Sequence, residues 1–490
     1  MTDKLKTLLL AISAALVAMG VALTVYVSTS EDPAPQVSPS PAPSVLPSPI
    51  ASVSPSPIPS PTPAASPSPK PSVVPSPTPT ISPTPSASPS ASPVVSIKLL
   101  TGMVEGFEFV ATTTTLPPAP VGLSYQLLSI TDVETTIPTY KGARVGKYGD
   151  KLDAASSIVV GNKYWIDIKG ITAGTYYPVV NGQQVQVQVL PKAFAFPAPI
   201  YMEMQFAAIS TANGLIDDGS TWVKRIALNK QYADILRAHG IEPIKQWAYV
   251  YPDVTNADFK SIVTTGNIAP PCLFGPSPSI PPTAAQLQAY EAAIKSGALP
   301  VGTWAYAWDE GEGDAADTAA ALARVKLIKQ YAPSLKVMIT RQFDSQFIPY
   351  VDIFTPIINW YNQPGFVPAS SYSSNVNVWL YHSCMSANRC NNATSEAAVD
   401  QLPSKFPMHA IDAPDTDPER FVTESLAAGA KAMLYYNTTE SITTATKVGG
   451  QYKFGNNGDG NDLYPALGYS KKLKYYRRGL NKEALKRAGF

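Results

Sequence analysis

The alternation of strand-like and helix-like segments after Ile200 constrains the fold of this chain more than any other feature of its sequence. Short runs rich in β-branched and aromatic residues are separated, in several places, by segments whose apolar residues recur with helical spacing. The candidate strands span residues 200–207, 241–248, 301–307, 336–341, 352–358, 376–382, 408–411 and 431–437. Eight strands in about 290 residues predict an α/β fold, a (β/α)8 TIM-like barrel over residues 193–490.

Residues 94–192 follow a different pattern, in which apolar and polar residues alternate and helical periodicity is absent. Val185 and Val187 share one face of a run whose other face carries glutamines. The dipeptide Asn181-Gly182 precedes this run and predicts a hairpin turn, because both residues tolerate positive φ. We therefore expect a small all-β sandwich domain.

Residues 1–30 have the pattern of a membrane-targeting segment. Lys4 and Lys6 precede an apolar run over residues 8–27, and acidic residues follow it. The run has about the ~20 residues that cross a bilayer, and the preceding charge predicts a cytoplasmic N-terminus. We expect an uncleaved signal anchor at the cell membrane, with a cleaved signal peptide and secretion as the alternative. In both cases the globular part is extracytoplasmic.

Residues 31–93 consist almost entirely of Ser, Pro and Ala, with hardly any charge. Such a composition cannot bury a core, so we expect a disordered linker with polyproline II character. At ~3.1 Å per residue this linker could reach on the order of 100 Å or more. Its expected role is to hold the globular part away from the membrane.

Composition excludes several classes of function. The net charge is +1 and 15% of the residues are charged, so the sequence has no electrostatic footprint for nucleic acid. With three cysteines and three histidines, and no zinc-ligand spacing among them, we expect no metal and no cofactor. The oligomeric state is left open.

Two of the cysteines lie close together in a segment that we expect to be exported. Cys384 and Cys390 flank a five-residue stretch directly after a candidate strand. In an oxidising compartment this spacing favours a disulfide between them, which leaves Cys272 as a free thiol. The alternative is three unpaired thiols.

The candidate chemistry centres on the end of the third candidate strand. The apolar run over residues 301–308 ends in Asp309 and Glu310, and Gly311 follows. The carboxyl ends of the strands are where β/α barrels place their catalytic residues. Two adjacent acids suit an acid/base role, because the charge of one favours the protonated form of the other. Neighbouring residues of a regular strand point to opposite faces, so both can face a pocket only if the strand ends there.

Polar and aromatic residues gather at or near the other candidate strand ends. Aromatic rings stack on the apolar faces of sugars, while carboxylates and amides bind hydroxyl groups. The expected substrate is therefore a glycan. The candidate substrate-binding residues are Trp247, Trp308, Arg341, Trp360, Tyr381, Asp412, Tyr435 and Asn437.

Eight segments of the sequence, taken in their order along the chain, resemble glycoside hydrolase family 123 and an uncharacterised group that shares its C-terminal region. The resemblance covers most of residues 94–490. The segments that carry it are TAGTYYPVVNG, YADILRAHGIEP, YAWDE, VWLYHSC, PMHAIDAPDTDPERF, GAKAMLYYN, GNNGDGNDLYP and KLKYYRRGLNKEAL.

The resemblance implies a retaining exo-β-N-acetylgalactosaminidase with substrate-assisted catalysis. By position, Asp309 would orient the acetamido group of the substrate and Glu310 would be the general acid/base. This sequence departs from the family in having Gly311 and then Glu312 after the acid pair, where proline is usual. The departure adds a third carboxylate to the loop.

Two other functions remain open at the level of the sequence. The first is a glycosidase for a different glycan, with Glu310 and either Glu312 or Asp412 as a conventional carboxylate pair. The second is a surface glycan-binding protein without catalysis.

Overall fold

The computed structural model describes residues 95–135, 144–215, 220–244, 281–309, 315–372, 376–382, 406–439, 442, 446–448, 451–454 and 460–490. These residues belong to one compact unit that begins at Ser88. The expected anchor and linker, the three cysteines, Trp247 and Glu310 lie outside the described residues. None of the described helices is long and apolar enough to cross a membrane.

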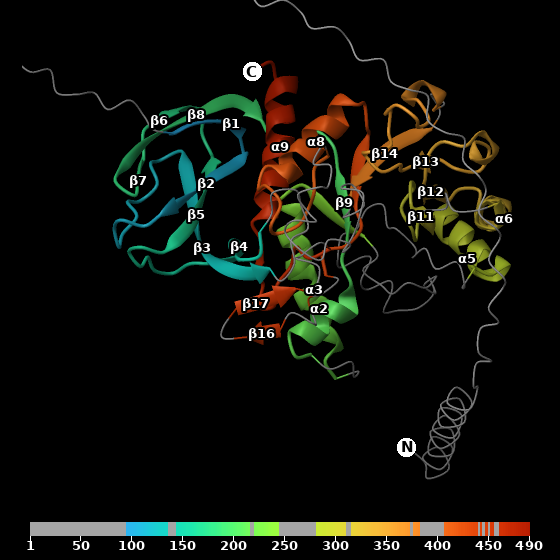
Figure 1. The fold of residues 1–490 in the computed structure, drawn as a ribbon, viewed down its shortest axis with the longest axis horizontal. Helices are drawn as coiled ribbons and strands as arrows, with labels where there is room; N and C mark the ends of the chain where they lie inside the picture. Colours follow the sequence, from blue (N-terminus) through green and yellow to red (C-terminus); the bar gives the residue numbers. More distant parts are fainter. Residues whose placement is uncertain are drawn as a thin grey trace, which may run out of the picture. The chain divides into compact units, whose positions relative to one another are not determined.

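The second half of the unit is built on a parallel sheet of seven strands, drawn in green to orange in Figure 1. Their order in the sheet is β10-β9-β15-β14-β13-β12-β11. The strands are β9 (Ile200–Glu203), β10 (Ile241–Ile244), β11 (Trp304–Asp309), β12 (Lys336–Thr340), β13 (Ile353–Phe354), β14 (Asn377–His382) and β15 (Ala432–Tyr435).

The parallel sheet is curled. The evidence is that side chains from strands far apart in the strand order meet on its inner face. The Tyr201 ring on β9 lies 5.6 Å from the Trp304 ring on β11, and both contact Trp379 on β14. No ladder joins β10 to β11 among the described residues, so the sheet is a curled, open relative of the predicted barrel.

The prediction of a strand over residues 408–411 is wrong. β14 pairs directly with β15, and residues 406–416, which include the predicted strand, form neither helix nor strand. Side chains take the place of a strand ladder here: Asp417 accepts a hydrogen bond from the Met408 backbone N–H (3.0 Å), and Lys472 donates one to the Ala413 carbonyl (2.7 Å). A buried backbone that is satisfied by side chains does not need a strand neighbour.

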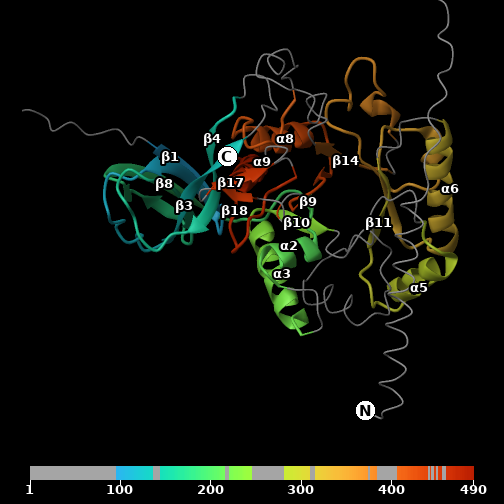
Figure 2. The same ribbon diagram turned by 60° about the horizontal axis from the view of Figure 1, so that its bottom comes forward.

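Helices cover the outer face of the curled sheet. Figures 1 and 2 show α5 and α6 beside β11, and α2 and α3 near β9 and β10. The α-helices are α2 (Phe206–Ala212), α3 (Trp222–Arg237), α5 (Ala284–Lys295), α6 (Ala315–Tyr331), α8 (Asp417–Ala427) and α9 (Lys472–Arg487), and the short 3-10 helices are η1 (Ser345–Phe347) and η2 (Ala369–Ser371). The start of α5 is fixed by a capping box between Thr283 and Gln286, which satisfies two backbone N–H groups that helix formation leaves free.

The first half of the unit consists of two β-sheets. One contains β1, β8, β6 and β7, and the other contains β2, β5, β3 and β4. Their bounds are β1 (Val95–Thr101), β2 (Val104–Val110), β3 (Leu123–Thr135), β4 (Lys147–Ala154), β5 (Lys163–Gly170), β6 (Gly174–Tyr176), β7 (Val179–Val180) and β8 (Gln183–Ala193).

Local features of these sheets agree with the sequence. Asn181 and Gly182 have φ values of 52° and 77° and form the two-residue turn between β7 and β8. Val185, Val187 and Val189 are buried on one face of β8.

Segments near the C-terminus complete the second of these sheets. β18 (Tyr469–Ser470) pairs with β4, and β17 (Gln451–Phe454), itself paired with β16 (Thr446–Val448), joins the end of β3. The helix α9 then contacts β2 and also packs on α8. Lys474 and Arg477 of α9 both bind the buried Asp167 on β5, at 2.6 and 2.5 Å.

Candidate active site

All seven parallel strands contribute side chains to an apolar cluster on the inner face of the curled sheet. We call it the interior cluster. It consists of Tyr201, Ile244, Trp304, Tyr306, Met338, Ile353, Ile357, Trp379, Tyr381, Ala432 and Leu434. No helix contributes to it among the described residues, so it fills the inside of the curl.

An irregularity in β11 turns Asp309 toward this inner face. Trp304 and Tyr306 belong to the interior cluster, whereas Ala305, Ala307 and Trp308 belong to a cluster shared with α5 and α6. The register with β12 shifts between Tyr306 and Trp308, which is the signature of a bulge. The extra residue moves Asp309 onto the same side as Tyr306, where strict alternation would have placed it on the helix side.

Two buried hydroxyl groups hold the Asp309 carboxylate. Tyr306 Oη donates to Asp309 Oδ1 at 2.5 Å, and Thr340 Oγ1 on β12 donates to the same oxygen at 2.7 Å. Tyr306 is 4% exposed and Thr340 1%, while Asp309 itself is exposed. Burial, and next the charge of Asp309, raise the pKa of Tyr306 well above its usual value, so its hydroxyl stays protonated and donates.

Tyr381 and Trp360 lie with Asp309 on the inner side of the sheet. Tyr381 is part of the interior cluster. Trp360 packs against the same cluster from the segment after β13 and stacks on Phe366, with ring centroids 5.9 Å apart. These two predicted substrate-binding residues therefore lie on the same side of the sheet as Asp309.

Trp308 does not face this site, and its expected place there is corrected. It lies on the helix side of the sheet, where the Arg324 guanidinium covers its ring at 4.7 Å. The bulge that brings Asp309 inward turns Trp308 outward.

Tyr435 also points to the helix side. It is fully buried and accepts a hydrogen bond from the Gly460 backbone N–H at 2.5 Å. It belongs to a group of buried polar rings and an acid between the sheet and α9, which we call the helix-side cluster: His382, His409, Tyr435, Tyr476 and Asp462. Strand alternation puts Tyr435 and His382 opposite their neighbours in the interior cluster.

The remaining predicted residues are buried, and two of them, Arg341 and Asn437, closely follow strands. Asn437 is fully buried, and its side-chain oxygen accepts hydrogen bonds from the backbone and hydroxyl of Thr439, at 2.8 and 3.0 Å. Asp412 is buried in the irregular segment before α8. Arg341 follows β12, is 7% exposed, and lies over the Phe347 ring with a 3.5 Å ion pair to Asp344.

Sequence reasoning missed three polar residues of the inner face: Tyr306, Thr340 and Glu203. Glu203 ends β9 in phase with Tyr201, is 2% exposed, and accepts a hydrogen bond from the Gln205 side chain at 3.3 Å. The available signal was a single acid in an otherwise apolar strand, on the face that carries Tyr201. Tyr306 stands three residues before the acid pair, and its role depends on the bulge.

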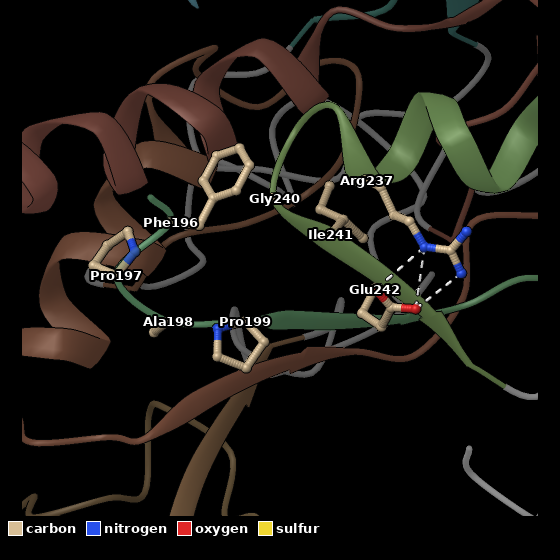
Figure 3. Close-up of a pocket in the computed structure, with 8 residues that line it drawn as sticks. All are labelled: Phe196, Pro197, Ala198, Pro199, Arg237, Gly240, Ile241 and Glu242. Atoms are coloured by element: carbon tan, nitrogen blue, oxygen red, sulfur yellow. Dashed lines mark hydrogen bonds and ion pairs between the residues drawn. The ribbon is translucent and has the colours of Figure 1, made fainter. Parts of the chain in front are cut away.

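A pocket of about 440 Å³ lies at the amino ends of β9 and β10 (Figure 3). Asp309 lies at the carboxyl end of β11, so the pocket and Asp309 are at opposite ends of the parallel strands. Its lining residues are Phe196, Pro197, Ala198, Pro199, Arg237, Gly240, Ile241 and Glu242. Its one charged pair is closed, because Arg237 binds Glu242 at 3.0 Å. We therefore take the carboxyl ends of the strands, where Asp309 lies, as the candidate active site.

Within the described ranges, no group of three or more His, Cys, Asp or Glu side chains is arranged to hold a metal ion.

No protein-family model matches this chain, and no curated protein matches its sequence. Its structure is similar to that of a family 123 glycoside hydrolase from Clostridium perfringens, solved in a study of glycolipid glycan hydrolysis. The TM-score is 0.52 at 10% identity, with 80% of this chain and 84% of that chain covered. A family 39 glycoside hydrolase from Bacteroides cellulosilyticus covers 79% of this chain and 81% of its own at 10% identity, with a TM-score of 0.34. The first likeness shows that this chain has a fold of the glycoside hydrolase type.

Proposed function

We propose that this protein is a retaining exo-β-N-acetylhexosaminidase, acting on N-acetylgalactosamine-like sugars by substrate-assisted catalysis. The observation that carries the proposal is the Asp309 carboxylate, exposed at the carboxyl end of β11 and held by Tyr306 and Thr340. The next residue in the chain is Glu310. The fold shared with a family 123 enzyme, whose study concerned glycolipid glycans, supports the same activity.

In the proposed mechanism the enzyme supplies no nucleophile. The acetamido oxygen of the substrate attacks the anomeric carbon, and the bond to the leaving oxygen breaks. Glu310 protonates the leaving oxygen as general acid and later activates water. Asp309 accepts a hydrogen bond from the acetamido N–H and stabilises the positive charge that develops on the cyclised intermediate.

The rest of the proposed site binds the sugar ring. Trp360, which is partly exposed and packs against the interior cluster, would offer a ring face to the apolar side of a pyranose. Tyr381, the other predicted aromatic residue on this side of the sheet, is buried within the cluster and would support the site from below. Of the residues predicted from sequence, Arg341 and Asn437 remain candidates near strand ends, Asp412 remains one in the irregular segment before α8, and Trp247 lies outside the described residues.

The proposed cellular setting rests on the N-terminal sequence. An anchor over residues 1–30 and a Pro/Ser/Ala linker over residues 31–93 would hold the hydrolase outside the membrane, within reach of surface glycans.

A panel of nitrophenyl β-glycosides tests the activity. We expect turnover of N-acetylgalactosaminide or N-acetylglucosaminide and none of the sugars that lack the acetamido group. Glu310→Gln should lower turnover of substrates with poor leaving groups by at least ~10²-fold and affect activated aryl glycosides less. Glycan binding without turnover of any member would replace the proposal with a binding function.

Added azide distinguishes substrate assistance from a conventional carboxylate pair. If the acetamido group is the nucleophile, azide should not restore activity to Asp309→Asn, because no protein nucleophile has been removed. Formation of a glycosyl azide would identify a protein carboxylate as the nucleophile and favour a different glycosidase mechanism.

A further inference from the structure

The two hydroxyl groups beneath Asp309 form an arrangement that the proposed reaction does not itself require. Tyr306 Oη and Thr340 Oγ1 lie 3.1 Å from each other, and each is nearer to Asp309 Oδ1, at 2.5 and 2.7 Å. Each hydroxyl has one proton, so the shortest contacts direct both protons to the same carboxylate oxygen. Hydrogen bonds to a charged acceptor are short and roughly twice as strong as neutral ones.

The second carboxylate oxygen has a different environment. No hydrogen bond to Asp309 Oδ2 joins it to the described part of the chain, and Asp309 is exposed. Because Oδ1 is fixed at two points, rotation of the carboxylate about its last bond is restricted. Oδ2 is therefore the oxygen presented to a substrate.

The support for this arrangement is rigid. Tyr306 packs within the interior cluster, and Thr340 is 1% exposed at the end of β12, directly beside Asp309 in the strand register. Positions on strands are held more exactly than positions on loops, and a shift of ~1 Å in a reacting group can cost on the order of 10²-fold in rate.

We infer that Tyr306 and Thr340 are positioning residues, which fix Asp309 so that Oδ2 accepts the acetamido N–H of an N-acetylated sugar. The inference rests on the proposed function. It extends that function by naming which oxygen meets the substrate and which two residues aim it. It also explains the bulge in β11, which is what brings Asp309 within reach of both hydroxyls.

The test removes each hydroxyl while keeping the shape of the side chain. Tyr306→Phe retains the ring in the interior cluster, Thr340→Val retains the volume, and Thr340→Ser retains the hydroxyl. The matched control is Tyr125→Phe, whose hydroxyl is buried in the sandwich without a partner among the described residues. All are made in the full chain and assayed with an aryl β-N-acetylhexosaminide and a thiazoline inhibitor.

We expect Tyr306→Phe to lower kcat by ~10 to 10²-fold with KM within about 3-fold, because the interaction with Asp309 strengthens mainly in the transition state, when positive charge develops on the acetamido group. Thiazoline binding should weaken in parallel with kcat/KM. Thr340→Val should also lower kcat with little change in KM, but to a smaller degree. Thr340→Ser should recover most of the activity, and Tyr125→Phe should match the parent.

A double-mutant cycle separates positioning from an independent effect. In the Asp309→Asn background, Tyr306→Phe should cost less than about 3-fold more, since the carboxylate that it positions is gone. An equal loss in both backgrounds would overturn the inference. So would full activity of Tyr306→Phe and Thr340→Val beside an inactive Asp309→Asn, although the proposed function would then stand.

Two further outcomes are distinguished. If Asp309→Asn itself turns over N-acetylated substrates normally, the proposed function fails, and the inference with it. If thermal unfolding shows that Tyr306→Phe does not fold, the two Thr340 variants test the inference instead, since they differ in the hydroxyl at one strand position. A lower kcat for Thr340→Val than for Thr340→Ser would support the inference, and equal kcat values would overturn it.

Discussion

The two faces of the curled sheet each contain a carboxylate, a tyrosine and further polar groups, in opposite settings. On the inner face Asp309 is exposed and accepts hydrogen bonds from Tyr306 and Thr340. On the outer face Asp462 is fully buried, 2.8 Å from His409 Nε2. The first arrangement leaves one carboxylate oxygen for a substrate, whereas the second is closed to solvent.

Burial in the helix-side cluster favours the neutral form of each titratable group. His409 Nδ1 lies 2.7 Å and His382 Nε2 lies 2.6 Å from Tyr476 Oη on α9. Burial lowers the pKa of His409 to about 3 and that of His382 well below its usual value, and burial raises the pKa of Asp462 well above its own. A buried network without charge avoids the large cost of burying ions. The contrast is one of access to solvent, because Asp309 is exposed and Asp462 is fully buried, and it is the reason why we propose a catalytic role for Asp309 alone.

The largest expected effect comes from a substitution on the inner face. Asp309→Asn should lower kcat by about 10² to 10³-fold, because an amide cannot offset the charge that grows on the intermediate. The melting temperature should stay close to that of the parent, since the carboxylate is exposed. Steady-state kinetics and calorimetry on the same preparation measure both. A lower melting temperature with normal kcat would make Asp309 structural.

The matching change on the outer face is Tyr476→Phe. It removes the hydroxyl shared by His382 and His409 and leaves two buried ring nitrogens unsatisfied, which should cost about 1–3 kcal/mol of unfolding free energy. Urea unfolding measures this. The kcat per folded molecule should be unchanged, and a loss of kcat in fully folded protein would contradict the division between the two faces.

The acid sensitivity of the outer face provides a third test. The folded-state pKa of His382 is depressed, so below about pH 6.5 a proton binds its ring in the unfolded chain alone. Its contribution to stability is therefore present above that pH and is lost as pH falls. His382→Gln should reduce the slope of unfolding free energy against pH, by an amount that approaches about 1.4 kcal/mol per pH unit as the pH falls from about 6.5 to about 5. Equal slopes in parent and variant would mean that His382 is protonated in the folded state.

The smallest expected effect concerns Trp308, which the sequence assigned to the substrate. Trp308→Phe should weaken the contact with Arg324 and cost about 0.5–1 kcal/mol of stability. KM should not change, because the ring lies on the helix side. A raised KM with unchanged stability would restore the assignment made from sequence.

Some features of this protein follow from the sequence because neighbouring residues decide them. Asn181-Gly182 forms the predicted hairpin turn because both residues accept positive φ, and the valines of β8 share a face because a strand alternates. The strands of the parallel sheet were also recognisable from local runs of β-branched and aromatic residues. The position of Asp309 at the end of one strand was recognisable because the apolar run stops there.

Other features depended on contacts between residues far apart in the chain, which no local pattern reports. The segment near Met408 is buried without being a strand because Asp417 satisfies its backbone, and β18 joins β4 across more than half of the chain. The same is true of the site itself. The aim of Asp309, and the outward turn of Trp308, come from a bulge against β12 and two hydroxyls that only the folded sheet brings together. Strand periodicity fixes which residues alternate, but the partner strand decides where the alternation breaks.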